Sequence, residues 1–211
     1  MKAFKLTDRA DQTYGGCQWG EGVEHTAPGK GELCTNGWIH CTTHPLLAVL
    51  LNPIQGGYDL KTAHLWRCKA TGKIKNGNGL KFGATKVKTI KRVSLPRITT
   101  EQRIRFGILC ALEVYQVEHF VQWAQSWLSG EDRTRVVAWS AKATTLDAQA
   151  DLAGQAACWA AEAAALADQD TWAAKDAAWA AKASTWAADG KFDLIKLAKK
   201  AVEGINTKSI L

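Results

Sequence analysis

The chain has 211 residues, of which 46% are apolar and 22% charged, and its formal net charge is +7. This composition supports a packed core and excludes wholesale disorder, and the length suits one domain or one domain with an extension. No run of about 18 apolar residues is present, so we expect no membrane-spanning helix. The N-terminal segment MKAFKLTDRADQ lacks an apolar stretch before its first acidic residues, so we expect no signal peptide and a cytoplasmic protein.

The positive charge is concentrated in one part of the chain. Residues 61–105 contain thirteen Lys and Arg but only one acidic residue, Glu101, whereas residues 1–60 sum to −2 and residues 106–211 to −3. A local excess of this size predicts an anionic partner and salt-sensitive association. The alternative is an ordinary solvated strand face.

The beginning of the chain predicts short strands separated by turns. KAFKL alternates as a strand, the glycine-rich residues 14–20 predict a turn or loop, and Asn36-Gly37 predicts a turn before another short strand. Thr42 or Thr43, followed by Pro45, predicts the start of a short apolar helix, PLLAVLL.

Two longer basic strands are predicted on either side of the sequence NGNG at 76–79, which is the strongest hairpin signal in the chain. In HLWRCKATGKI, alternation places Arg67 and Lys69 on the face opposite Trp66 and Cys68. KVKTIKRVSL alternates in the same way, and Pro96 ends the sheet region.

Helical spacing replaces strand alternation near residue 98. Thr99 and Gln102 have the spacing of a capping box before an apolar helix, and a second helix is predicted to end at Gly130. We therefore predict an α+β fold, with a small twisted, antiparallel-rich sheet domain over residues 1–98 and a C-terminal α-helical extension over residues 99–211.

Residues 138–188 contain 23 alanines in 51 positions, which strongly favours helix. Large residues recur every seven positions in two runs that are out of phase, so we predict a break near Asp168-Gln169-Asp170 and a hairpin or docked pair of helices. Tryptophans among alanines allow close packing, either on the chain's own domain or between subunits of a homo-oligomer. The mixed, slightly acidic polar face predicts no membrane partner. The segment KFDLIKLAKKAVE predicts a final amphipathic helix.

Six cysteines without a C-x-x-C pair predict free thiols, and the apolar surroundings of Cys110 and Cys158 predict core positions. A zinc site or a Cys-His nucleophile pair are alternatives to consider, because five candidate residues lie close in sequence. These residues are His25, Cys34, His40, Cys41 and His44. Paired ligand spacing, a third orienting group and the standard enzyme motifs are all missing, so we predict no metal, no cofactor and no catalytic residue.

The residues best suited to bind a ligand are aromatic, amide and basic. Trp and His rings can stack on a base, an amide can bind a base edge, and Lys or Arg can neutralise phosphate. The predicted ligand-binding set is Gln18, Trp19, Trp38, His40, Arg67, Lys69, Lys81, Lys86, Lys88 and Arg92. We expect the cations of residues 61–105 to share one surface and form a concave seat for an anion.

A series of segments in chain order has a family resemblance. The segments are KAFK, GCQWGEG, ELCTNGWIHC, ATGKI, NGLKFGATKVKTIKRVSLP and RIRFGILCALEV, followed by WLSGEDRT, the Trp-Ala repeats and FDLIKLA. This order resembles a family of uncharacterised phage and prophage proteins whose N-terminal domain has no known function. The family pattern Gly-aromatic-His-x-Cys is replaced here by Gly37-Trp38-Ile39-His40-Cys41, which moves the imidazole to the other face of a strand. The resemblance implies a phage or prophage origin and supplies no activity.

Three functions are consistent with these features. The favoured hypothesis is a binding module that sequesters a host nucleotide immune signal, such as a cyclic or ADP-ribose-derived nucleotide. The second is a nucleotide-acting enzyme like the ADP-ribosyltransferases, which would need a catalytic acid from Glu21, Glu24, Glu32 or Asp59. The third is an inhibitor of a host defence complex that binds nucleic acid or protein.

Overall fold

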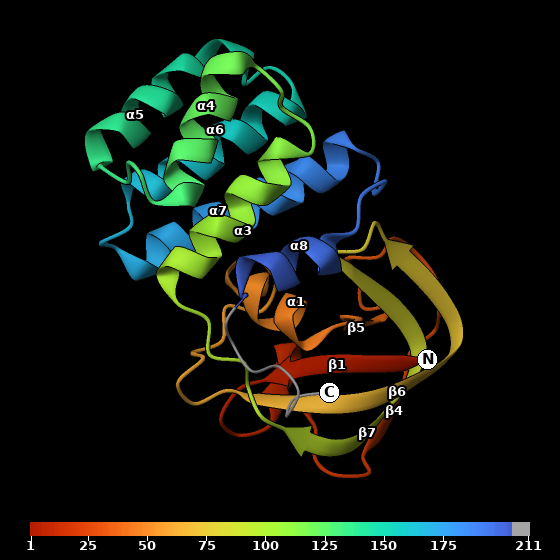
Figure 1. Cartoon of the computed structure of the whole chain (residues 1–211). Coiled ribbons are helices and arrows are strands. Elements are labelled where there is room, and N and C mark those ends of the chain that lie inside the picture. The colour runs from red at the N-terminus through yellow and green to blue at the C-terminus, as the bar shows by residue number, and fades with distance from the viewer. Residues whose placement is uncertain (204–211) are drawn as a thin grey trace. The chain divides into compact units, whose positions relative to one another are not determined.

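The computed structural model describes residues 1–203, and the contacts among them divide the chain into two units, Met1–Arg97 and Ile98–Glu203 (Figure 1). The first unit contains an antiparallel sheet and the second contains only helices, so the predicted α+β fold is confirmed.

The sheet of the first unit is built around a long hairpin. Strands β6 (His64–Gly77) and β7 (Lys81–Val93) pair along most of their length. Strand β1 (Lys2–Thr7) pairs with the other edge of β6. The other side of β7 pairs with two short strands, β4 (Glu24–Thr26) and β5 (Ile39–Cys41). The turn of the hairpin is the predicted NGNG segment, because Asn78 (φ 53°) and Gly79 (φ 83°) adopt the left-handed conformation that these residue types tolerate.

The sheet closes on itself through residues that follow β5. The amide of Phe4 donates to the carbonyl of Thr42 at 2.9 Å, and the amide of Thr42 donates to the carbonyl of Phe4 at 3.0 Å. Closure gives the sheet an inner and an outer face. The inner face is filled by an apolar cluster, and part of the outer face is covered by helix α1 (Pro45–Leu50), which packs Ala48 on Phe4 and Leu65.

One local prediction for this unit differs from the structure. Helix α1 is capped by His44, whose Nδ1 accepts a hydrogen bond from the amide of Leu46 at 3.2 Å, and not by Thr42 or Thr43. The reason is tertiary, because Thr42 is held in the bridge to Phe4. The glycine-rich stretch contains a turn as predicted, because a 3-10 turn, η1 (Tyr14–Gly16), joins the short paired strands β2 (Gln12–Thr13) and β3 (Cys17–Gln18). Helix α2 (Asn52–Gln55) follows α1.

The second unit is a bundle of helices joined by short connections (Figure 1). Its helices are α3 (Thr100–Leu112), α4 (Glu118–Ser129), α5 (Arg135–Thr144), α6 (Leu152–Ala165), α7 (Asp170–Ala187) and α8 (Leu194–Ala201), with a 3-10 turn, η2 (Leu146–Ala148), after α5. The predicted capping box is present, because Thr99 and Gln102 each accept a hydrogen bond from the other's backbone amide. Gly130, with φ 86°, ends α4 as predicted.

The alanine-rich segment folds as a helix pair. Helix α6 ends at Ala165 and α7 begins at Asp170, so the predicted break is confirmed. The rings of Trp159 and Trp179 stack between the two helices with their centroids 6.4 Å apart. Small residues allow close approach in this bundle, since a Cβ added at Gly107 of α3 would lie 3.0 Å from the Cα of Ala177.

One stripe of α7 faces solvent while most of the helix is buried. The exposed fractions are 54% at Trp172 and 48% at Trp186, and lysine ammonium groups lie over these rings, Lys175 at 5.2 Å and Lys182 at 4.4 Å from the centroids. Exposed aromatic rings at heptad spacing are typical of helix interfaces. The homo-oligomer expected from these tryptophans stays a prediction.

Candidate ligand-binding site

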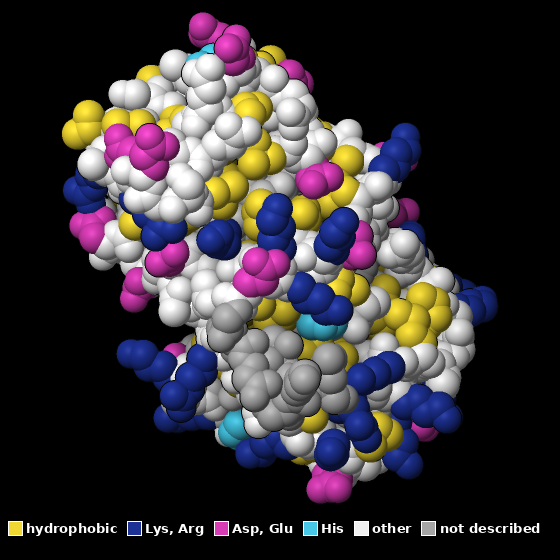
Figure 2. Space-filling view, in the orientation of Figure 1, with side chains coloured by type: hydrophobic (Ala, Val, Ile, Leu, Met, Phe, Trp, Pro, Cys, Tyr) yellow, Lys and Arg dark blue, Asp and Glu magenta, His cyan; other side chains and the backbone are white. Residues whose placement is uncertain are grey.

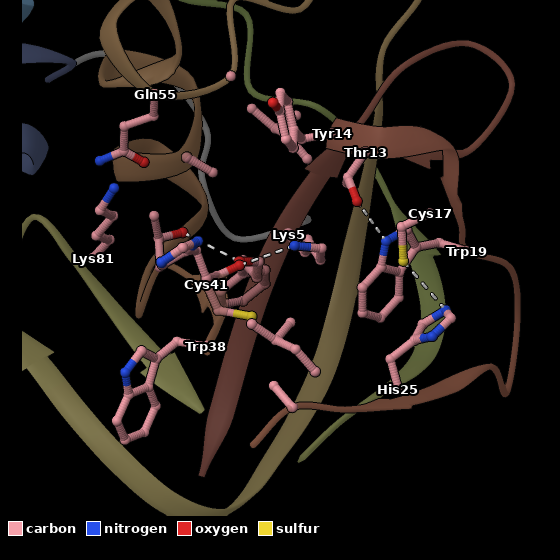
Figure 3. Close-up of a pocket in the computed structure, with 18 of the residues that line it drawn as sticks. Lys5, Thr13, Tyr14, Cys17, Trp19, His25, Trp38, Cys41, Gln55 and Lys81 are labelled. Atoms are coloured by element: carbon pink, nitrogen blue, oxygen red, sulfur yellow. Dashed lines mark hydrogen bonds between the residues drawn. The ribbon is translucent and has the colours of Figure 1, made fainter. Parts of the chain in front are cut away.

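A pocket of about 440 Å³ opens into the strand-containing unit (Figure 3). Residues of β1, β5, the β2–β3 hairpin and the α1–α2 segment form most of its wall. Its volume is in the range of small-molecule sites, which are typically about 300–1,000 Å³. Five aromatic residues line it, namely Phe4, Tyr14, Trp19, Trp38 and Tyr58. Two lysines, Lys5 and Lys81, line it as well, whereas no Asp or Glu of residues 1–203 does.

Lys5 lies inside the closed sheet because of strand alternation. Ala3, Lys5 and Thr7 occupy alternate positions of β1, and Ala3 and Thr7 are fully buried. The Lys5 Nζ donates to the carbonyl of His40 at 3.0 Å and lies 4.8 Å from the centroid of the Trp19 ring. Figure 3 shows its side chain reaching between Cys41 and the Thr13–Trp19 side of the pocket. The sequence prediction missed Lys5, although its place in register with Ala3 was a usable signal.

His40 lies in a positive part of the pocket. Its Nε2 is hydrogen-bonded to the carbonyl of Leu33, which must accept. Burial lowers the pKa of His40, and the nearby charges of Lys81 and Lys5 lower it further, against the opposing effect of the Leu33 hydrogen bond. The imidazole is therefore neutral at neutral pH. The ammonium groups of Lys5 and Lys81 are both close enough to the His40 ring to lower its pKa, so an anion placed beside His40 would be attracted by two cations.

The opposite side of the pocket is built from Trp19 and His25. The Trp19 side chain is 3% exposed, and its Nε1 donates to the Thr13 hydroxyl at 2.9 Å. The His25 ring meets it edge-on with centroids 4.5 Å apart. This hydrogen bond and the packing fix the orientation of the indole, which is almost fully buried in the wall of the pocket.

The histidine and cysteine residues of this region do not form an evident nucleophile. His25 Nε2 lies 2.7 Å from the Gln18 carbonyl and 3.6 Å from Cys17 Sγ. Because a carbonyl can only accept, Nε2 bears the proton and cannot take one from the thiol. Burial raises the pKa of Cys41, which disfavours a thiolate there. Within residues 1–203, no cluster of three or more His, Cys, Asp or Glu side chains is arranged to hold a metal ion, and all six cysteines are free thiols.

The structure brings four of the ten predicted ligand-binding residues together at the pocket. These four are Trp19, Trp38, His40 and Lys81. The other six do not line it, and three of these have different partners. The amide of Gln18 donates to the carbonyl of Ala10 at 2.9 Å, Lys86 pairs with Glu24 at 2.9 Å, and Arg92 pairs with Asp11 at 2.8 Å.

Arg67, Lys69 and Lys88 lie on the outer face of the sheet. Their neighbours Cys68 and Val87 belong to the inner cluster, and successive side chains of a strand point to opposite faces. The expected concave seat is therefore not formed by the cations of residues 61–105 as a group. Lys81 is the member of that block that lines the pocket.

Asp11 organises a polar network beside the inner cluster. Its Oδ1 accepts from His64 Nδ1 at 2.8 Å and from Trp66 Nε1 at 2.9 Å, and its Oδ2 accepts from Arg92 at 2.8 Å. Burial alone would raise the pKa of Asp11, but the hydrogen bonds from His64 and Trp66 and the charges of His64 and Arg92 outweigh it and hold the pKa below 3.8. Arg92 is thus a structural residue in this arrangement.

Comparison with known proteins identifies one domain. Residues 1–101 match a family described as a domain of unknown function (DUF7666), which covers the strand-containing unit and the start of α3. No curated protein and no solved structure matches the chain. The N-terminal domain without known function is confirmed, and the phage or prophage origin stays a prediction. None of the helices in the described part of the chain combines the length and apolar character needed to cross a bilayer.

Proposed function

We propose that the pocket binds a small phosphate-bearing ligand with a planar ring, of the nucleotide class. The observation that supports this most directly is the make-up of its wall, which contains Lys5, Lys81, five aromatic residues and, among residues 1–203, no carboxylate side chain. Ammonium groups in a partly desolvated pocket favour phosphate, and an indole face favours a base. In the setting of a phage infection, such a module would sequester a host nucleotide signal in the host cytoplasm.

The other two functions have less support at this pocket. Glu21, Glu24, Glu32 and Asp59, the acids that an ADP-ribosyltransferase-like reaction would draw on, are not among the lining residues. An inhibitor that binds nucleic acid would use a larger surface than this pocket, and the outer face of the sheet is the relevant place for it.

Calorimetry and thermal shift with defined nucleotides test the proposal. The panel is AMP, GMP, ADP-ribose and a cyclic dinucleotide, with adenosine and inorganic phosphate as partial ligands. We expect at least one nucleotide to raise the melting temperature more than either partial ligand. Bound phosphate should also raise the pKa of His40, which a titration of its ring proton by NMR would report. A panel without any stabilising nucleotide contradicts the proposal.

Substitution of the two lysines gives a second test. Lys5→Met and Lys81→Met retain much of the side-chain volume but remove the charge, and each should weaken nucleotide binding about 10- to 100-fold, because a charge-assisted hydrogen bond is lost. Lys73→Met, at an exposed lysine outside the pocket, is the matched control and should bind normally. Equal affinities for all three variants would show that the ligand lies elsewhere.

A further inference from the structure

Most cations of the basic block, residues 61–105, lie outside the pocket, and several of them are neighbours on the sheet. The register of the sheet places Lys2 opposite Lys69, and Lys69 opposite Lys88, in one row across β1, β6 and β7. In an adjacent row, Arg67 lies opposite Lys91. Lys69, Lys88 and Lys91 are exposed, and Arg67 is half-buried. Figure 2 shows dark-blue Lys and Arg side chains at several places on the strand-containing unit.

This arrangement is unfavourable for the isolated sheet. Like charges placed directly opposite on neighbouring strands repel each other and destabilise the pairing. Within residues 1–203, no ion pair joins Arg67, Lys69, Lys88 or Lys91 to a carboxylate. The one acid in register with the row is Glu24, opposite Lys88, and it pairs with Lys86. An anionic partner with several charges would relieve the repulsion.

The spacing and chemistry of the face favour a regular polyanion. Neighbouring strands lie about 4.8 Å apart and alternate residues of one strand about 6.6 Å apart, so the cations form a two-dimensional array of closely spaced charges. The aromatic residues of these three strands, Phe4, Trp66 and Phe82, are all buried. The face therefore offers charge without rings to stack on bases or to anchor in a lipid surface.

We propose that this outer face of β1, β6 and β7 binds the phosphate backbone of a nucleic-acid duplex without reading its sequence. Lys69, Lys88, Arg67 and Lys91 each neutralise a phosphate and release a counterion. The site is independent of the pocket, because these side chains point away from the inner face that Lys5 occupies.

Salt-dependent binding to a mixed-sequence DNA duplex of about twenty base pairs, followed by fluorescence anisotropy, tests this proposal. For about four phosphate contacts, the logarithm of the association constant should fall against the logarithm of salt concentration with a slope of about −4. The double variant K69Q/K88Q should weaken binding and make this slope shallower by about 2. Lys5→Met in the pocket should bind the duplex as the native protein does.

Two further variants separate a specific effect from loss of structure or of net charge. K30Q/K61Q removes the same charge from exposed positions outside the face and should change the slope less than K69Q/K88Q. Glu24→Gln removes the acid beside Lys88 and releases Lys86, so it should tighten binding and steepen the slope by about 1. Absence of duplex binding at 50 mM salt would overturn the proposal. So would equal effects of the two double variants, or binding to phosphatidylserine vesicles but not to the duplex.

Discussion

Replacing Asp11 with alanine is expected to lower the free energy of unfolding by about 2–4 kcal/mol, because it removes a charged acceptor and leaves the buried Trp66 Nε1 without a partner. Asp11 also adopts φ 60°, where alanine is strained and glycine is not. Asp11→Gly should therefore be less destabilising than Asp11→Ala if backbone strain contributes. Urea denaturation of the three proteins measures both effects.

The loss of stability that follows removal of the Asp11 charge should depend on pH in a defined direction. The pKa of Asp11 is lower in the folded protein than its usual 3.8. Its contribution to the free energy of unfolding is therefore fully present above pH 3.8 and is lost as the pH falls through the pKa of the folded state. The difference between the native protein and Asp11→Asn should shrink below pH 3.8. Arg92→Gln is the matched control, since the Arg92 side chain is half exposed and its loss should cost about 1 kcal/mol or less. If Asp11→Asn unfolds with the native free energy at pH 7, the network has no stabilising role.

Replacing Asp176 with asparagine is expected to stabilise the helical unit at pH 7. Asp176 is 5% exposed on α7, and burial, together with the charge of Glu162, raises its pKa to about 6. Lys142 and Lys175 oppose this rise, and Lys142 is held by Glu162 at 2.7 Å. A rise from 3.8 to about 6 corresponds to an upper limit of about 3 kcal/mol, so we expect Asp176→Asn to gain about 1–3 kcal/mol at pH 7.

This gain should depend on pH in the direction opposite to that of Asp11. A carboxyl group whose pKa is raised by folding stabilises the folded state at low pH, and this stability is lost as the pH rises from about 4 to about 6. The advantage of Asp176→Asn should therefore vanish near pH 4, as measured by thermal unfolding across the pH range. Asp147→Asn, at an exposed carboxylate of the same unit, should show little effect. A destabilised Asp176→Asn at pH 7 would mean that the buried charge has a stabilising partner.

Local signals predicted much of the fold. The Thr99–Gln102 capping box, the Asn78-Gly79 turn and the end of α4 at Gly130 depend on residues within a few positions of one another, so sequence spacing is sufficient to find them. The break between α6 and α7 was evident from the phase change in the seven-residue spacing. The candidate site was predicted less completely, because Lys5 lines the pocket and was missed, whereas Arg92 was included and is bound to Asp11.

The sequence by itself determined the class of fold, the position of the hairpin, the helical second half and the excess of positive charge before residue 106. Only the tertiary structure decided which cations line a pocket and which lie on the outside. Closure of the sheet by the Phe4–Thr42 bridge places Lys5 on an inner face, and the register of β6 with β7 places Lys69 and Lys88 together on the outer one. Strand alternation assigns side chains to two faces, but long-range pairing alone determines which face is enclosed.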